Sequence, residues 1–342
     1  MSLVFMDGFD HYETADILKK WSTTTVWTPT FGTILPGVSP AWSRAPGGQA
    51  LRLNGSAQTL TKNLSTTIVT GVVGFNLMLN TIGAATIFIF MDGGTEQCSL
   101  RMNASGQITF NRGTTVLATS SNNIVAATWY HIEIKATINN TTGTYEVRVN
   151  GSSSGWIAPA TGANTRNGTN NYFSQVQLIS NVVETFDDFY VLNCAISPNN
   201  DFLGPQKIFV LLPEKNGTYN QFTPNYMDNF ENVRETTGDA DNTFNQSSTV
   251  NNIDSFNLTN VPTATINAIQ HVILARQDAG AQRAIASFQR QGTTDVAGST
   301  NMNLAGSYLY YLDPKDTNPA DSNSAWTASG INNSEFGYKL VQ

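Results

Sequence analysis

The chain has 342 residues, and 13% of them are charged, about half of the usual fraction of roughly 25%. Its formal net charge is −7, and Lys and Arg occur singly, so there is no basic stripe of the kind that follows a phosphate backbone. We therefore expect no nucleic-acid partner. Asn, Thr, Ser and Gly fill most polar positions, which indicates a surface that binds through hydrogen bonds rather than dense charge.

The N-terminus predicts a short strand followed by a helical turn. Leu3–Met6 is the strand, and Thr14 is the expected N-cap of one or two helical turns. Asp16 in the first turn and Lys20 in the last suit the helix dipole. No cationic segment followed by an apolar core opens the chain, and the longest apolar run, residues 84–91, is too short to span a membrane. We expect neither a signal peptide nor membrane insertion.

Short strands dominate the first domain. The two most apolar runs, residues 69–79 and 86–91, predict central strands of two sheets, because a strand that is buried on both faces needs no polar alternation. Further strands are expected at residues 50–53, 58–62, 97–102, 107–111 and 115–118. Many short strands with almost no helix predict a β-sandwich.

The best-defined element is a hairpin at residues 129–151. In its first strand Ile132 and Ile134 alternate with polar residues, and a polar turn at residues 139–143 leads to a second alternating run. The pattern predicts two antiparallel strands with one solvated face. A later strand at residues 186–193 opens with two acidic residues.

A polar segment punctuated by Pro and Gly, residues 198–205, predicts a linker between a first domain of residues 1–197 and a second of residues 206–342. The sequence predicts β structure for the second domain as well. We expect strands at residues 207–212, 307–312 and 336–341, a hairpin formed by residues 268–276 and 282–289, and a short helix or turn at residues 324–332.

Residues 216–246 predict a long loop that carries several aromatic side chains. Tyr219, Phe222, Tyr226 and Phe230 are its candidates for contact with a partner. A loop of this length usually has a function of its own. We therefore expect it to be the docking loop of the second domain.

The hairpin and the last strand of the first domain carry a resemblance to a known superfamily. Trp-Tyr-His at residues 129–131, a Gly turn, a strand ending in Asn150-Gly151 and the late Asp-Asp-Phe-Tyr-Val at residues 187–191 resemble the concanavalin A-like, laminin-G-like jelly-roll superfamily. The resemblance implies an all-β protein with an N-terminal jelly-roll sandwich, followed here by a smaller β-sandwich-like domain. This fold hosts lectins, glycanases and structural domains, so it leaves the function open.

Other motifs resemble virion proteins of tailed bacteriophages. They are Asp-Gly-Phe-Asp-His-Tyr at residues 7–12, Asn-Gln-Phe-Thr-Pro at residues 220–224, Ala-Arg-Gln-Asp-Ala-Gly-Ala-Gln-Arg at residues 275–283 and a final Phe-Gly-Tyr-Lys at residues 336–339. The resemblance implies a structural protein located in the virion. Its expected partners are other virion proteins and further copies of itself, as a homo-oligomer.

Catalytic carboxylates of jelly-roll glycanases alternate along one strand, so that both face one cleft. No Glu-x-Asp-x-Glu strand occurs here. Glu133 and Glu146 are followed at alternate positions by Lys135 and Arg148, which predicts charge pairs on a solvated surface. We therefore expect no enzyme.

A polysaccharide-degrading enzyme stays open as a lesser alternative. It would use Glu184 or Asp187, which cluster with Asp188. The adjacent pair Asp187 and Asp188 point to opposite faces of a strand, which argues against a shared cleft.

Calcium is the one metal for which the sequence offers candidates, and no other cofactor is expected. Asp7, Asp10, Asp187 and Asp188 meet if the first and last strands of the first domain pair. The alternative is that these carboxylates cap turns. The three histidines lie far apart and lack zinc-ligand spacing.

Four aromatic residues are candidates for stacking on a sugar. Trp27, Trp42, Trp156 and Tyr172 lie in loop-like stretches with Asn, Thr and Ser nearby. The alternative is that they bury in the core or in an oligomer interface.

The resemblance to virion proteins, together with the lack of a catalytic constellation, implies a non-enzymatic accessory or decoration protein of a phage head or tail. The alternative is a glycan-binding receptor-recognition module of a tail fibre, with a host surface glycan as its ligand. Cys98 and Cys194 are expected to be buried, reduced thiols.

Overall fold

The computed structural model describes residues 1–23, 32–36, 48–55, 57–278 and 280–342. Two compact units make up this part of the chain, Met1–Ile208 and Phe209–Gln342.

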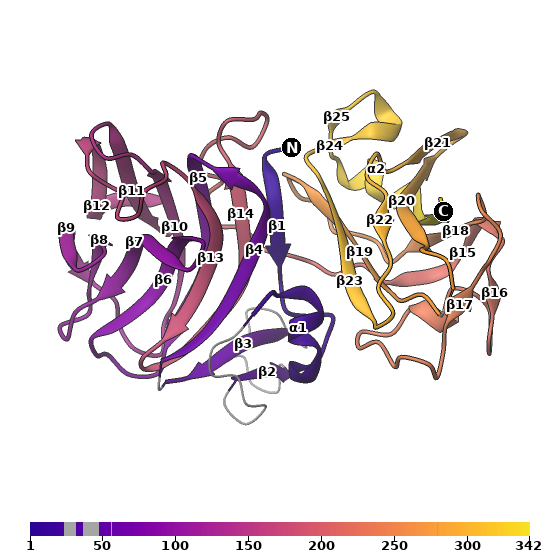
Figure 1. Cartoon of the computed structure of the whole chain (residues 1–342), viewed down its shortest axis with the longest axis horizontal. Helices are drawn as coiled ribbons and strands as arrows, with labels where there is room; N and C mark the ends of the chain where they lie inside the picture. Colours follow the sequence, from indigo (N-terminus) through magenta and orange to yellow (C-terminus); the bar gives the residue numbers. More distant parts are fainter. Residues whose placement is uncertain (24–31, 37–47, 56, 279) are drawn as a thin grey trace. The chain divides into compact units, whose positions relative to one another are not determined.

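The first unit consists of two antiparallel sheets (Figure 1). One has the order β12-β11-β10-β5-β14-β3-β2, with β1 paired to β14, and the other has the order β4-β13-β6-β7-β8-β9. The chain passes repeatedly from one sheet to the other, as in a jelly roll. The predicted all-β, jelly-roll sandwich architecture is confirmed by this strand order. The strands are β1 (Leu3–Asp7), β2 (Gly32–Pro36), β3 (Gln49–Asn54), β4 (Gln58–Ile68), β5 (Thr70–Leu79), β6 (Ala85–Asp92), β7 (Thr95–Met102), β8 (Gln107–Arg112), β9 (Thr115–Asn123), β10 (Trp129–Thr137), β11 (Gly143–Val149), β12 (Ser152–Ala163), β13 (Phe173–Ser180) and β14 (Val183–Asn193).

Aromatic side chains form the core between these sheets. Phe75 on β5 and Phe88 on β6 come from opposite sheets, and their ring centroids lie 5.9 Å apart. Phe186 on β14 packs on Phe75 at 5.7 Å, and all three rings are fully buried. Burial of each ring removes roughly 150–250 Å² from water. The two apolar runs of the sequence are thus β5 and β6, in the interior of the two sheets, as predicted.

The predicted hairpin is formed by β10 and β11, which pair antiparallel. Ile132 lies opposite Val149 and Ile134 opposite Val147, and all four side chains are buried on the core face. Local alternation and a polar turn were therefore sufficient to identify this element.

A short helical segment follows β1, with η1 at Thr14–Asp16 and α1 at Ile17–Lys20. The predicted N-cap, Thr14, is wrong: the cap position of η1 is Glu13, and its side chain makes no capping hydrogen bond. Tertiary packing holds the segment instead, because Trp21 directly after α1 is buried edge-on to Phe5, with ring centroids 5.2 Å apart.

The second unit is a smaller sandwich-like β structure. Its main sheet has the order β15-β18-β26-β20-β21, with β22 paired to β20, and β19 and β23 form a separate two-stranded ribbon. Ile273 on the ribbon packs against Ile285 and Leu340 of the main sheet. The elements are β15 (Pro213–Asn220), β16 (Thr223–Pro224), η2 (Glu231–Val233), β17 (Asn245–Gln246), β18 (Ile253–Leu258), β19 (Ile269–Ala275), β20 (Ala284–Gln291), β21 (Thr294–Ala297), β22 (Met302–Asn303), β23 (Leu309–Lys315), β24 (Thr317–Asn318), η3 (Pro319–Asp321), β25 (Ser324–Ala325), α2 (Ala328–Asn332) and β26 (Ser334–Leu340).

Two predictions for the second unit are wrong. Residues 207–212 form no strand, and the first strand begins at Pro213. The strands β19 and β20 do not form a hairpin with each other: β19 pairs with β23, while β20 pairs with β26, β21 and β22. The strand prediction at residues 336–341 and the short helix within residues 324–332 are confirmed by β26 and α2.

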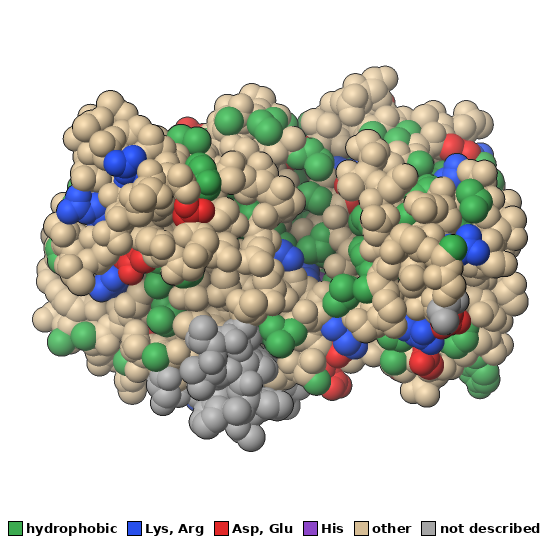
Figure 2. All heavy atoms as spheres, in the orientation of Figure 1, with side chains coloured by type: hydrophobic (Ala, Val, Ile, Leu, Met, Phe, Trp, Pro, Cys, Tyr) green, Lys and Arg blue, Asp and Glu red, His purple; other side chains and the backbone are tan. Residues whose placement is uncertain are grey.

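The surface carries few charges. On the face drawn in Figure 2, Lys, Arg, Asp and Glu stand in small separate groups among neutral polar atoms. None of the helices in the described residues is long and apolar enough to cross a membrane. Both cysteines are free thiols; Cys98 is buried, as predicted, whereas Cys194, which was also predicted to be buried, is half-buried. Burial raises the pKa of Cys194 to about 11.

Candidate functional site

The long loop of the second unit, residues 221–246, is held in one shape by asparagine side chains. Asn232 is buried; it donates to the Phe244 carbonyl at 3.0 Å and accepts from the Met227 N–H at 3.3 Å. Asn225 accepts from the Phe244 N–H at 2.7 Å. These bonds replace the ladder that a regular strand would supply, because each asparagine offers both a donor and an acceptor.

The base of this loop is fixed by one buried carboxylate, Asp254 on β18. Its Oδ1 accepts from the backbone N–H groups of Gln221 and Phe222 at 2.7 and 2.9 Å. Its Oδ2 accepts from the Asn229 amide at 2.7 Å and from the Tyr338 hydroxyl at 3.3 Å. A carboxylate that is fully satisfied in this way anchors both ends of the segment it bonds.

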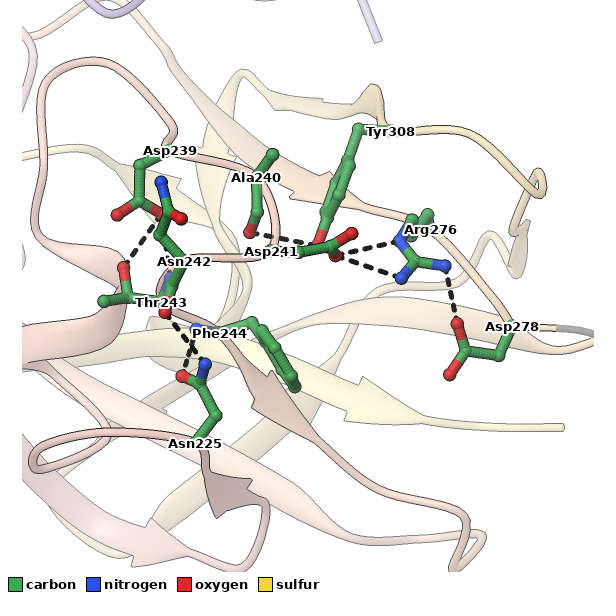
Figure 3. A network of polar contacts seen from close by, with 10 residues as sticks. All are labelled: Asn225, Asp239, Ala240, Asp241, Asn242, Thr243, Phe244, Arg276, Asp278 and Tyr308. Atoms are coloured by element: carbon green, nitrogen blue, oxygen red, sulfur yellow. Dashed lines mark hydrogen bonds and ion pairs between the residues drawn. The ribbon is translucent and has the colours of Figure 1, made fainter.

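A network of polar side chains holds the far end of the loop (Figure 3). Arg276, at the end of β19, donates to Asp241 at 3.0 Å and to Asp278 at 2.5 Å. Tyr308 donates from its hydroxyl to Asp241 at 2.9 Å and to the Ala240 carbonyl at 3.1 Å. The hydrogen bonds from Tyr308 and Arg276 lower the pKa of Asp241. The loop is therefore attached to the ribbon as well as to the main sheet.

The four predicted docking residues differ in exposure. Tyr219 and Phe222 are half-buried and pack edge-on against aromatic side chains of the sheet, with ring centroids 5.5 and 4.9 Å apart. Phe230 is also half-buried. Tyr226 is 71% exposed, and its neighbour Met227, which the sequence did not single out, is 50% exposed. An exposed aromatic–methionine pair on a fixed backbone is the feature of this loop that is best suited to contact another molecule.

Of the predicted glycan-contact residues, Trp27 and Trp42 lie outside the described residues. Trp156 lies on the edge strand β12, half-buried, and its ring is edge-on to Tyr130 at 6.2 Å. Tyr172 precedes β13, and its carbonyl accepts from Gln97. Trp156 and Tyr172 are thus on different elements, each with its own surroundings.

The predicted pairing of the first and last strands occurs, because β1 pairs with β14. It does not assemble a calcium site in the described residues, where no group of three or more His, Cys, Asp or Glu comes together. Asp7 instead accepts four hydrogen bonds. The donors are Lys20 Nζ at 2.9 Å, Trp21 Nε1 at 2.7 Å, the Tyr12 hydroxyl at 2.5 Å and the Phe9 N–H at 2.9 Å. Four donors fill the lone pairs that a metal would need.

The other candidate carboxylates also have protein partners. Asp10 accepts from the Gln49 N–H at 2.6 Å, and burial is the main cause that raises the pKa of Asp10 to about 6. Asp188 has a left-handed backbone at a bulge in β14 and accepts from the Asn76 amide and the Ile208 N–H, both at 2.7 Å. These bonds fit the alternative interpretation of the sequence, in which the carboxylates hold turns.

The two carboxylates of the alternative enzyme do not share a cleft. Glu184 lies two residues before Phe186, whose ring is in the core, so both side chains point inward. Asp187 lies opposite Asn76 on the other face of the sheet. Ser180 and the Asn181 N–H lie near the Glu184 carboxyl group and lower its pKa slightly against the effect of burial, but neither makes a hydrogen bond of regular geometry to it.

The burial of Glu184 predicts a pH dependence. Burial raises the pKa of Glu184 well above its usual 4.5, so the folded state holds a proton that the unfolded state has lost. The free energy of unfolding should therefore fall as pH rises above 4.5, by up to about 1.4 kcal/mol per pH unit, until the folded-state pKa is reached. Glu184→Gln should make this slope shallower in urea titrations above about pH 5, and the remaining slope comes from the other carboxyl groups with raised pKa values, Asp10 and Glu133. An unchanged slope would refute the assignment.

A buried polar network on the outer face of the larger sheet was missed by the sequence analysis. Glu133, predicted to be solvated, is instead fully buried. It accepts from the Tyr190 hydroxyl at 2.7 Å and from the backbone N–H groups of Leu203 and Gly204 at 2.7 and 3.1 Å. Burial raises the pKa of Glu133 despite these donors. A Cβ on Gly74 would overlap the Tyr190 ring, so glycine is required beneath it.

The segment that covers this face is residues 199–208, here termed the strap; it includes residues 199–205 of the predicted linker and belongs to the first unit. Lys135 bonds Asp201 at 2.9 Å, and the Arg148 guanidinium lies 3.9 Å from the Phe202 ring centroid. The predicted partner of Lys135, Glu133, is thus replaced by a strap residue. The alternating pattern of β10 could not predict that Glu133 is buried, because the strap that covers it lies about 70 residues later in the sequence.

Comparisons with known proteins give limited help. No protein-family profile and no curated protein matches the sequence. Among solved structures, a sialidase is similar over 56% of this chain and 18% of its own, with 10% identity and a TM-score of 0.40. A GH131 β-glucanase catalytic domain from Podospora anserina covers 55% of this chain and 95% of its own (14% identity, TM-score 0.36). A galectin from Caenorhabditis elegans covers 41% of this chain and 94% of its own (10% identity, TM-score 0.29).

The chain spans less than a third of the length of the sialidases that it resembles. All of these TM-scores are below 0.5, so the likenesses carry no argument about function. The assignment of the fold rests on the strand order and on the core described above.

Proposed function

We propose that this protein is a non-enzymatic structural component of a tailed-phage particle and that it binds a neighbouring virion protein through the loop of its second unit. The observation that carries the proposal is the exposed pair Tyr226 and Met227 on a loop whose backbone is held by buried asparagines and by Asp254. A fixed loop loses little conformational entropy on binding, so exposed apolar side chains on it contribute most of their contact energy. The motifs shared with phage virion proteins support the particle as the location.

The location can be tested first, by quantitative mass spectrometry of purified particles against the major capsid protein. A copy number comparable to that of the capsid protein would favour a head-decorating or tail-sheathing role. A low copy number would favour a neck, baseplate or fibre component. Absence from the particle would contradict the proposal.

Replacing Tyr226 and Met227 together with serine should reduce incorporation into particles at least about tenfold, as expected when an interface loses an aromatic anchor worth about 1.4 kcal/mol or more. The variant is expressed in place of the natural chain, and its copy number per particle is measured. Val116 and Val125, which are 53% and 57% exposed in the first unit, supply the matched control when changed to serine. Equal loss from both double variants would refute a specific role for the loop.

A second candidate, glycan binding, is favoured by the half-buried rings of Trp156 and Tyr130, which pack together on the larger sheet, since a partly accessible aromatic ring face suits stacking on a sugar. Saturable binding to host polysaccharide should be lost in Trp156→Ala and partly kept in Trp156→Phe. Calorimetric titration would measure both, and full binding by Trp156→Ala would exclude this site.

A further inference from the structure

The ends of β1 and α1 enclose a lysine and an aspartate in a dry aromatic environment. Lys20 Nζ lies 2.9 Å from Asp7 Oδ1, with the side chains 1% and 0% exposed. The ammonium also lies 5.7 Å from the ring centroids of both Phe5 and Tyr12. Full burial is the main cause that lowers the pKa of Lys20. Burial favours the neutral forms of both groups, but Lys20 and the other donors around Asp7 outweigh it and lower the pKa of Asp7. The pair therefore rests as ammonium and carboxylate, and the neutral amine is a transient form.

The two carboxylate oxygens of Asp7 accept hydrogen bonds from different donors. Oδ2 accepts from the Tyr12 hydroxyl at 2.5 Å and from Trp21 Nε1 at 2.7 Å. Oδ1 faces Lys20 and the Phe9 N–H, both at 2.9 Å. Two fixed donors on one oxygen are the arrangement that stabilises a developing oxyanion at that atom.

The imidazole of His11 also contacts the lysine. Its Nε2 is 3.2 Å from Lys20 Nζ. Burial first, and then the charge of Lys20, lower the pKa of His11 to about 3, so its imidazole is neutral while Lys20 is charged. The amine therefore lies against both a carboxyl group and an imidazole, and this imidazole becomes a better proton acceptor once the ammonium has lost its charge.

We propose that Lys20 and Asp7 condense into an intramolecular amide, which cross-links the end of β1 to the end of α1. The ammonium first passes one proton to Asp7 Oδ1, which gives an amine and a carboxylic acid. The amine then attacks Cγ and gives a second proton to His11, while negative charge collects on Oδ2 beside Tyr12 and Trp21. His11 returns that proton to Oδ1, which leaves as water. The Nζ–Cγ bond forms, the Cγ–Oδ1 bond breaks, and nothing is oxidised or reduced.

Complete burial distinguishes the Lys20–Asp7 pair from an ordinary surface ion pair. Folding holds the amine in contact with the carboxyl group, which supplies the high effective concentration that amide formation from an unactivated acid requires. The neighbouring pair Lys19 and Asp16 is as close, at 2.7 Å, but its side chains are 28% and 15% exposed. Water can solvate that pair, so it should stay ionic and serves as an internal control.

The test is the mass of the intact full chain after purification. We expect a mass lower than that of the sequence by one water molecule, together with a branched tryptic peptide that joins Asp7 to Lys20. Lys20→Arg keeps the charge but cannot form the amide, and it should show the full mass. His11→Ala should slow the loss of water in freshly purified protein.

A cyclic imide at Asp7-Gly8 would lose the same mass, but it would leave Lys20 open to trypsin and would persist in Lys20→Arg. That outcome, or a wild-type mass that stays at the sequence value after prolonged incubation of the folded protein, would overturn the proposal.

Discussion

Replacing Lys20 with methionine should lower the free energy of unfolding of the first unit by about 3–5 kcal/mol, the usual cost of leaving a buried charge without its partner. Asp7 would keep Tyr12, Trp21 and the Phe9 N–H as donors but would lose Lys20, whose Nζ lies 2.9 Å from Asp7 Oδ1. Urea unfolding followed by tryptophan fluorescence would measure the change, since Trp21 is buried beside the pair.

Lys19→Met supplies the matched control, because it removes a charge one position earlier on the same helix. Its ion pair with Asp16 is partly exposed, and such pairs contribute about 0–1 kcal/mol. If the two variants unfold at the same urea concentration, burial of the Lys20–Asp7 pair does not stabilise the unit as described.

Asp254→Ala should destabilise the second unit by roughly 1–3 kcal/mol, the usual cost when removal of one partner leaves buried hydrogen-bond donors without an acceptor. The change leaves two backbone N–H groups, the Asn229 amide and the Tyr338 hydroxyl without their acceptor. Hydrogen exchange should show that residues 221–246 lose protection before the rest of the unit, because Asp254 anchors the base of that loop.

Asp321→Ala is the comparison for this variant, since Asp321 accepts from the nearby Ser324 hydroxyl in an exposed position. Its effect should be within about 0.5 kcal/mol, as for most surface changes. A uniform loss of protection across the unit in Asp254→Ala would show that this carboxylate supports the sheet rather than the loop.

Local patterns predicted the fold well where strand partners are neighbours in sequence. The alternation of Ile132 and Ile134 and the turn after them were enough to define β10 and β11. The same reasoning failed for β19 and β20, which look like a hairpin around residues 276–283. Their real partners, β23 and β26, lie about 40 and 50 residues later, and alternation identifies a strand without identifying its neighbour.

The candidate sites were harder to predict because burial there depends on distant segments. Glu133 has the pattern of a solvated residue, and only the strap makes it buried. The sequence around Asp7 is typical of a metal ligand or a turn cap, but in the structure its carboxylate forms an ion pair with Lys20. The loop at residues 216–246 was recognised from its length and aromatic content, whereas the choice of Tyr226 over Tyr219 required the burial of each ring.

The pairing of β1 with β14 has a consequence for biosynthesis. Leu3 lies opposite Leu192, so the first strand leaves the ribosome long before its neighbour exists. At about 5–20 residues per second, it waits roughly 10–40 s for that neighbour. During this interval the nascent chain exposes an unpaired apolar edge, and the strap is made later still. The first unit can therefore complete its sheet only when its last residues have been translated.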